Sequence, residues 1–183
     1  FYTFYTGCEG APRTMEQWLS IPEFYLAEAT NGEVFDDPLG HFTRIRQEIL
    51  TGRPRDVRLK KLASSLFYMA QAGQYNYSRC MAHGERGAAA LALSEFVKNA
   101  ASAVFLLNDV YEPYYKWVFR AMKELPVLGD CALQLEELLS ASCDAEKNKA
   151  IIEALCSRLI QVLVEQGLAE PAGDYLEPYA YGV

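Results

Sequence analysis

The stretch that decides the fold class is residues 86–110, which read RGAAALALSEFVKNAASAVFLLNDV. Alanine and leucine dominate it, and no proline or glycine follows Gly87, so its intrinsic helix propensity is high. The segments on either side space their apolar residues by three and four, and nowhere do apolar and polar residues alternate with period two over a useful length. The sequence therefore predicts an all-α protein with few or no strands.

A second long helix is predicted just before this one. Pro54 suits a first helical turn, and the apolar residues that follow recur at helical spacing until Gly84 closes the pattern. Long helices joined by short loops favour antiparallel packing, because each then buries its apolar stripe against a neighbour. We therefore expect an antiparallel helical bundle, with residues 1–183 forming a single helical domain. Turn residues around Asp36 and Pro38 predict a short irregular segment near residues 33–42.

The other predicted helices are shorter. Thr14 and Gln17 have the spacing of a capping box at the start of the first one. Pro113 is expected to start a further helix, which Pro126 and Gly129 then end. The remaining expected helices cover about 22–30, 43–52, 130–141 and 144–166.

Composition excludes several classes of function. The chain has 183 residues, 51% of them hydrophobic, which is typical of a globular protein. A net charge of −7 argues against general nucleic-acid binding, because phosphate contacts need clustered lysine and arginine. Basic residues do concentrate between 44 and 61, and this allows an anion to be steered there, although an ordinary solvated face has the same composition.

Neither a membrane segment nor a secretion signal is evident. No uninterrupted apolar run approaches the roughly 18 to 20 residues of a membrane-spanning helix, and no signal segment opens the chain. The five cysteines lack a CxxC pair, which fits reduced thiols. We therefore expect a cytoplasmic protein that does not bind membranes.

The chain also lacks the patterns of familiar catalytic and metal sites. It has no Walker-type phosphate loop, GxGxxG, GxSxG or HExxH. Asp36 and Asp37 are adjacent, so they do not form the DxD pair that holds a metal ion. Cys80 and His83 lie one helical turn apart, but two ligands do not make a structural site. We expect neither a metal site nor a complete catalytic set in this chain.

Hydrogen-bonding side chains gather on three successive predicted helices. The first group contains Tyr75, Asn76 and Arg79, the second Glu95, Asn99 and Ser102, and the third Tyr115, Lys116 and Arg120. Each group alone also fits a solvated helix face. Glu112, Lys116 and Arg120 would lie on the polar stripe of an amphipathic helix beginning at Pro113. Antiparallel packing would allow the three groups to line one cleft.

Four stretches carry a resemblance to a known family. They are TNGEVFDDPLGHFTRIRQEI (30–49), RPRDVRLKKLA (53–63), GQYNYSRCMAHGERGAAALALSEF (73–96) and AVFLLNDVYEPYYKWVFRAMKELP (103–126). The chain resembles the bacterial helical family called domain of unknown function 4037 over residues 30–126, and residues 127–183 would be a C-terminal helical annex. In that family the helical domain typically follows a nucleotidyltransferase-like domain. It is also similar to the helical substrate-binding half of kanamycin-type nucleotidyltransferases.

The resemblance implies a function for the chain as half of an enzyme. Magnesium and a nucleoside triphosphate would bind to an N-terminal nucleotidyltransferase-like domain, and this chain, which begins at Phe1, would be a fragment lacking it. The chain would bind an unidentified small-molecule or macromolecular acceptor and would not be catalytic alone. Glu95 would orient or deprotonate an acceptor hydroxyl. The expected acceptor-binding residues are Tyr75, Asn76, Arg79, Glu95, Asn99, Tyr115, Lys116 and Arg120.

The alternative is a helical protein-interaction module. Such a module would dock on a partner through exposed aromatic side chains and would not bind a small molecule. A ribonuclease of the HEPN type is disfavoured, because only three residues separate Arg79 from His83. Convergence of the polar groups on a concave pocket would favour acceptor binding, and their dispersal would favour the interaction module.

Overall fold

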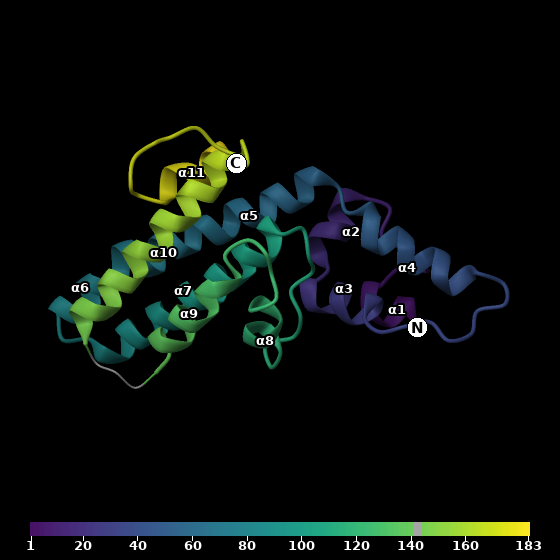
Figure 1. Ribbon diagram of the computed structural model, residues 1–183, viewed down its shortest axis with the longest axis horizontal. Helices are drawn as coiled ribbons and strands as arrows, with labels where there is room; N and C mark the ends of the chain where they lie inside the picture. The colour runs from purple at the N-terminus through teal and green to yellow at the C-terminus, as the bar shows by residue number, and fades with distance from the viewer. Residues whose placement is uncertain (141–143) are drawn as a thin grey trace.

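The computed structural model describes residues 1–140 and 144–183, and over these residues the protein is all-α, as predicted, with no strand. Figure 1 shows an elongated molecule in which the first four helices lie at one end and the longer helices at the other. The first half contains α1 (Tyr2–Thr6), α2 (Met15–Ser20), α3 (Glu23–Thr30), α4 (His41–Gly52), α5 (Arg55–Met69), the π-helix η1 (Ala70–Tyr77) and α6 (Ser78–Ala82). The second half contains α7 (Arg86–Leu107), α8 (Val118–Met122), the 3-10 helix η2 (Gly129–Cys131), α9 (Ala132–Leu138), α10 (Ala145–Glu165) and α11 (Glu177–Gly182).

The centre of the fold is α7, which packs against α5, η1, α6, α8 and α9. The chain runs out along α5, η1 and α6, turns at Gly84 in the left-handed region, and returns antiparallel along α7 (Figure 1). By length and composition α7 would also be apolar enough to cross a membrane, but 56% of its most apolar window is buried inside the fold. Its apolar side chains therefore have partners in the core.

Two hydrophobic clusters hold the fold together. The larger one is built on α5, η1 and α7, and it includes side chains from α9, α10 and α11. The smaller cluster surrounds Trp18 and Leu26 and contains side chains from α1, α2, α3, α4 and the beginning of α5. Tyr111, in the loop after α7, packs against this second cluster. The chain therefore passes from one cluster to the other and back.

The predicted long helix from residue 55 into the low 80s is confirmed in extent, but its middle is π-helical. A Cβ on Gly73 would lie 2.3 Å from Cδ2 of Phe96 and 3.0 Å from Cγ2 of Ile152, so a side chain there would clash with α7 and crowd α10. π-helical segments are rare and are often found at functional sites. In this protein the segment brings the backbone of η1 close to Phe96 in the centre of the larger cluster.

The prediction of a helix that starts at Pro113 is wrong. Residues 108–117 form a loop, and only Val118–Met122 is helical. The aromatic residues that follow Pro113 are weaker helix formers than alanine or leucine. The amphipathic stripe that would have included Lys116 and Arg120 therefore does not exist, and the loop takes its course from tertiary contacts.

Most of the other helix predictions are confirmed. Thr14 and Gln17 form both hydrogen bonds of the capping box, and the Asp144 carboxylate accepts a hydrogen bond from the N–H of Lys147 at the start of α10. Residues 33–40 are irregular, as expected, although α4 begins at His41 rather than at Thr43. The helix expected over 130–141 is shorter, because α9 ends at Leu138. Four cysteines are free thiols, and Cys143 lies outside the described residues.

Candidate functional site

The loop of residues 108–117 leaves α7 through a turn in which Asp109 takes a left-handed conformation. Asp109 has φ 55, and the N–H of Val110 donates to the carbonyl of Phe105 at 3.1 Å. This six-to-one hydrogen bond is the Schellman ending of a helix, in which glycine usually takes the left-handed position. An aspartate accepts this conformation more readily than most residues. Its carboxylate is thereby placed at the beginning of the loop.

Side chains anchor the loop at several points. The Asn108 amide donates to the Val127 carbonyl at 2.9 Å and accepts from the Val127 N–H at 3.0 Å. Further along, the hydroxyl of Tyr111 donates to the carbonyl of Ile49 at 2.6 Å. The loop is therefore tied both to the segment before α9 and to α4.

A partly buried ion-pair network surrounds Arg53, whose side chain is only 5% exposed. Its guanidinium contacts the Glu23 carboxylate at 2.8 Å and the Asp109 carboxylate at 2.5 Å. Lys61 pairs with Glu23 at 2.7 Å, and Arg58 lies 3.8 Å from Asp109. Charges buried in this way need such partners, because desolvation is otherwise costly. The network holds α3, the start of α5 and the loop in one arrangement.

On one side of the loop lies a cavity of about 730 Å³, hereafter the Glu112 cavity. It opens to solvent and is lined by residues of α2, α3, α5, α7 and the loop, with Tyr114 and Tyr115 on the loop side. Its volume is in the range of small-molecule sites. The charged and hydroxyl side chains on which its chemistry depends are Glu23, Lys61, Lys98, Ser102 and Glu112.

Glu112 is the most unusual group in this cavity. Its Oε2 accepts a hydrogen bond of 2.5 Å from the Ser102 hydroxyl. Burial raises the pKa of the Glu112 carboxyl from its usual 4.5 to about 7, against the opposing effect of the Ser102 hydrogen bond; among the nearby charges, Glu23 raises the pKa and Lys98 lowers it. A carboxyl with a pKa near neutrality can both take up and release a proton at physiological pH.

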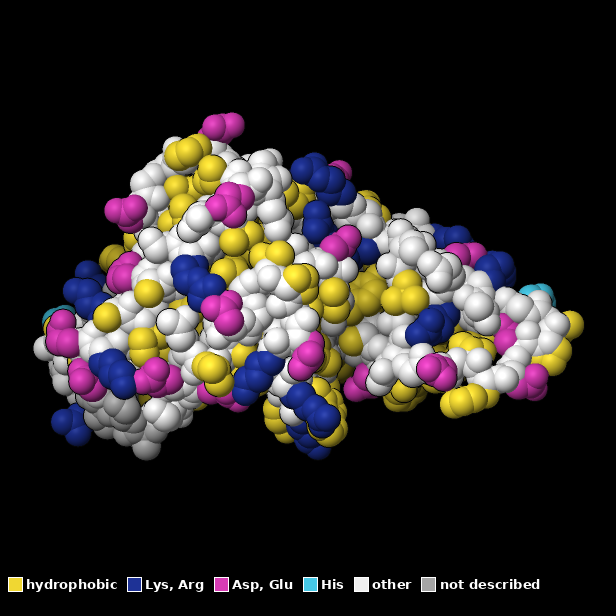
Figure 2. Space-filling model, viewed as in Figure 1, with side chains coloured by type: hydrophobic (Ala, Val, Ile, Leu, Met, Phe, Trp, Pro, Cys, Tyr) yellow, Lys and Arg dark blue, Asp and Glu magenta, His cyan; other side chains and the backbone are white. Residues whose placement is uncertain are grey.

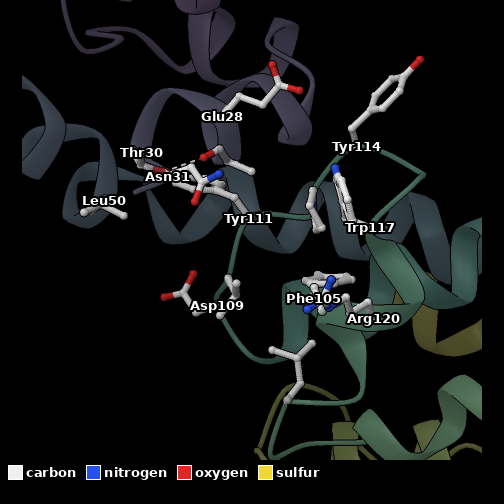
Figure 3. A pocket seen from close by; sticks show the side chains of 15 residues that line it. Glu28, Thr30, Asn31, Leu50, Phe105, Asp109, Tyr111, Tyr114, Trp117 and Arg120 are labelled. Carbon is white, nitrogen blue, oxygen red and sulfur yellow. Dashed lines mark hydrogen bonds between the residues drawn. The ribbon is translucent and has the colours of Figure 1, made fainter. Parts of the chain in front are cut away.

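On the other side of the loop is a second cavity, of about 680 Å³, hereafter the Trp117 cavity. Figure 2 shows the surface hollowed between the lobe that contains α8 and the N-terminal helices. In the close-up of Figure 3, Trp117 and Arg120 lie on one side of this cavity, and Asn31 and Asp109 lie on the opposite side. The loop therefore separates two cavities, and Pro113 and Tyr114 line both of them.

The structure does not bring the eight residues expected to bind an acceptor into one cavity. Asn76 and Glu95 share a third cavity of about 540 Å³, and Glu95 also accepts a hydrogen bond of 2.9 Å from the side chain of Asn99. Arg79 lies over the ring of Tyr75, 4.9 Å from its centroid. These five residues thus form two small groups along η1, α6 and α7.

The remaining three belong to the loop region. Tyr115 lines the Glu112 cavity, and Arg120 lines the Trp117 cavity. Lys116 lies on the loop, 6.0 Å from the centroid of the Tyr114 ring. The roles expected for all eight stay predictions. The three polar groups are dispersed over three cavities and do not converge on one cleft.

Glu112 is not among the predicted site residues, because the helix expected from Pro113 would have put it on a solvated stripe. In the sequence Ser102 shares a predicted helix face with Glu95 and Asn99, but its hydroxyl instead donates to Glu112. The one available signal was Glu112 itself, an acid between an apolar segment and Pro113. Within residues 1–140 and 144–183, no group of three or more His, Cys, Asp or Glu side chains is placed to hold a metal ion.

The fold and its cavities define an all-α helical domain in which one loop lies between two concave regions of the surface. Residues 18–118 match the family described as Domain of unknown function (DUF4037), and because the match covers more than half of the chain, the chain belongs to this family. The match includes every residue that lines the Glu112 cavity. Comparison with curated proteins and with solved structures gives no match.

Proposed function

We propose that this protein is the acceptor-binding helical domain of a nucleotidyltransferase-like protein and that the acceptor binds in the Glu112 cavity. The observation that carries the proposal is the Glu112 carboxyl, which has a pKa of about 7 and lies in a cavity of about 730 Å³. Perturbed carboxyls in concave sites are candidates for catalytic acids and bases.

The geometry around Glu112 supports a role as general base. Oε2 already accepts a hydrogen bond from an alcohol, the Ser102 hydroxyl. In the part of the chain that the structure describes, Oε1 of Glu112 has no hydrogen-bond partner. This oxygen is therefore available to accept a hydrogen bond from a ligand. An acceptor hydroxyl or amine that donates to Oε1 would be held and activated by the same carboxylate. Glu112 therefore replaces Glu95 as the favoured base, because Glu95 lines a different cavity, together with Asn76.

The transfer step divides between two parts of the protein. Glu112 takes the proton from the acceptor, the acceptor oxygen forms a bond to the α-phosphorus of a nucleoside triphosphate, and pyrophosphate leaves. Magnesium and the triphosphate would bind to an upstream nucleotidyltransferase-like domain, and the metal would neutralise the charge of the departing phosphates. The lysines Lys61 and Lys98 add positive charge beside the base.

The test is a transfer assay on the protein in its natural full length. A nucleoside triphosphate labelled in the α-phosphate is incubated with magnesium and a panel of small alcohols, sugars and amines. Labelled product is expected, and Glu112→Gln should lower its rate about 100-fold or more. Glu95→Gln is the matched control and should retain the rate. Absence of transfer to every acceptor, or an equal loss in both variants, would overturn the proposal.

The interaction module remains a second candidate, because two observations favour it. The polar groups expected to bind an acceptor are dispersed over separate cavities, and aromatic side chains of the loop are exposed. Tyr115 and Trp117 on the loop are 67% and 56% exposed, and aromatic side chains of this kind often anchor protein partners. On this reading a partner captured by the chain would be lost on Tyr115→Ser or Trp117→Ser but retained on Glu112→Gln. A partner that is lost on Glu112→Gln but retained on Tyr115→Ser and Trp117→Ser would instead support acceptor binding.

A further inference from the structure

A further cavity, of about 280 Å³ and hereafter the Asn148 cavity, lies among η1, α6, α7, α9 and α10. The four α-helices of this set pack on one another at the end of the molecule away from the N-terminus (Figure 1). Its volume is near the lower limit of small-molecule sites. None of its described lining residues belongs to the loop of residues 108–117, so this cavity is separate from the Glu112 and Trp117 cavities.

Two buried polar side chains from different helices meet in this cavity. The Asn148 amide donates to the Tyr77 hydroxyl at 3.0 Å, and each residue is only 2% exposed. This bond uses one hydrogen of the Asn148 amide and one lone pair of the Tyr77 oxygen. Over residues 1–140 and 144–183, the Tyr77 hydroxyl donates to no acceptor, and Oδ1 of Asn148 accepts from no donor. The pair therefore offers the cavity a free donor and a free acceptor.

The free donor and the free acceptor are close enough for one small polar group to reach both. They belong to two side chains whose bonded atoms are 3.0 Å apart. If the oxygen and nitrogen of the Asn148 amide exchange places, the Tyr77 hydroxyl donates to the amide, and the pair again keeps both a donor and an acceptor. Buried polar groups are nearly always hydrogen-bonded, so these two need a partner.

The other polar side chains of the Asn148 cavity are occupied or lie at its edge. The Ser94 hydroxyl donates to the Ala90 carbonyl at 2.9 Å, and the Ser140 hydroxyl donates to the Glu137 carbonyl at 2.6 Å. Arg86, in the first turn of α7, is exposed. The apolar lining includes Met81, Ala89, Leu93 and Leu138. A ligand would therefore pack an apolar body on these side chains and present one polar group to the buried pair.

The polar group that matches the pair is an uncharged carboxamide. Its oxygen accepts and its nitrogen donates, and the two atoms are neighbours, as are the donor and the acceptor of the pair. A carboxylate has no hydrogen to donate to Asn148, and an unpaired charge is costly in an apolar cavity. Tyr77 is also the last residue of the π-helix η1, and π-helical segments are often found at functional sites.

We propose that the Asn148 cavity binds a small uncharged molecule in which an apolar or aromatic body carries a primary carboxamide. The carbonyl of the ligand accepts a hydrogen bond from the Tyr77 hydroxyl, and its N–H donates to Oδ1 of Asn148. The site shares no described residue with the Glu112 cavity. The inference therefore goes beyond the proposed function, and either one can fail while the other holds.

The experiment uses the 183-residue chain and benzamide as the probe. Three analogues of the same body serve as comparisons. Acetophenone keeps the carbonyl but lacks the N–H, benzoate carries a charge, and benzyl alcohol has one oxygen that must both donate and accept. Affinities are measured by titration calorimetry well below the unfolding temperature. Benzamide is expected to bind about tenfold more tightly than acetophenone, because acetophenone leaves Oδ1 of Asn148 without a donor.

Substitutions of the pair separate its two hydrogen bonds. Asn148→Leu should remove the preference for benzamide over acetophenone, and Tyr77→Phe should weaken both ligands. Because both substitutions also lower stability, a third variant leaves the pair intact. Ala90→Trp fills the cavity from an exposed helical position and should abolish binding. Ala88→Trp is its matched control, exposed on the same helix but outside this cavity, and should leave the affinity for benzamide unchanged.

Four outcomes would overturn the proposal. Benzamide does not bind, which would leave the pair to water; or acetophenone or benzyl alcohol binds as tightly as benzamide; or Ala90→Trp leaves the affinity for benzamide unchanged, which would place the ligand elsewhere. The fourth is tighter binding of benzoate that is lost on Arg86→Gln, which would make Arg86 the residue that recognises the ligand in place of the buried pair.

Discussion

Arg53 lies over the ring of Tyr111, with its guanidinium carbon 4.7 Å from the ring centroid. The same guanidinium pairs with Glu23 and Asp109, so one side chain joins α3 to both the first residues and the middle of the loop. This contact combines a cation–π interaction with two ion pairs at a nearly buried position. Arg53 is therefore the residue on which the position of the loop depends most.

Arg53→Met should destabilise the fold by about 2–3 kcal/mol, because it removes a charge-assisted hydrogen bond to the partly buried Glu23, which keeps Lys61 as its other partner. The free energy of unfolding measured in urea tests this. Arg44→Met is the control: Arg44 is 58% exposed in its pair with Glu48, and such surface pairs contribute about 1 kcal/mol or less. Equal losses in the two variants would contradict the role given to Arg53.

The stability of the protein should depend on pH through Glu112. Its pKa is raised in the folded state to about 7, so the folded protein holds this proton more tightly than the unfolded chain. The protonated Glu112 carboxyl therefore stabilises the fold in full below about pH 4.5. This contribution to the free energy of unfolding is at most about 3 kcal/mol, and it is lost as the pH rises to about 7.

Glu112→Gln removes this dependence, because glutamine keeps a hydrogen-bond acceptor for Ser102 without a charge. The variant should be more stable than the wild type at pH 8, and the difference should shrink towards pH 5. Urea unfolding at both values measures it, and Glu124→Gln, at an exposed glutamate, serves as the control. A constant difference between Glu112→Gln and the wild type would exclude the raised pKa.

Gly73→Ala should destabilise the protein by about 1–3 kcal/mol, because the added Cβ would overlap Phe96 at 2.3 Å. Gly87→Ala is a control with the opposite expected sign. Nothing lies within 4 Å of a Cβ at Gly87, and alanine in a helix is favoured over glycine by up to about 1 kcal/mol. The unfolding temperatures of both variants test this. An unchanged unfolding temperature for Gly73→Ala would show that the Phe96 ring can move aside without loss of stability.

Tyr77→Phe should destabilise by about 1–3 kcal/mol. The Asn148 side chain donates to the Tyr77 hydroxyl at 3.0 Å, and both residues are 2% exposed, so the amide would be left unpaired. Tyr68→Phe, at a position 49% exposed, should have little effect. If the two variants unfold alike, water must satisfy Asn148 in place of the tyrosine.

The helices that the sequence predicted well are those whose signals are local. The apolar composition of residues 86–110 and the capping box at Thr14 act through neighbours in the chain, and both predictions are confirmed. The assignment to the family is also confirmed, over residues 18–118. Local patterns were therefore sufficient for the fold class and the family.

The candidate site depends on contacts that no local pattern contains. Tyr111 bonds to a residue 62 positions earlier, and Asp109 pairs with one 56 positions earlier. These contacts hold residues 108–117 in a loop where the apolar spacing after Pro113 favoured a helix. Once the helix is replaced by a loop, Glu112 moves from an expected solvated stripe into a cavity. Its raised pKa follows from that burial, so it was not predictable from the sequence.

Pro113 and Tyr114 are a wall that the Glu112 cavity and the Trp117 cavity have in common. A molecule that displaces either residue from one side reshapes the compartment on the other side. Two occupants would then be linked thermodynamically, and each would change the affinity of the other by the same factor. Pro113 and Tyr114 are not helical, so such a linkage would act through a few backbone torsions and not through the long helices.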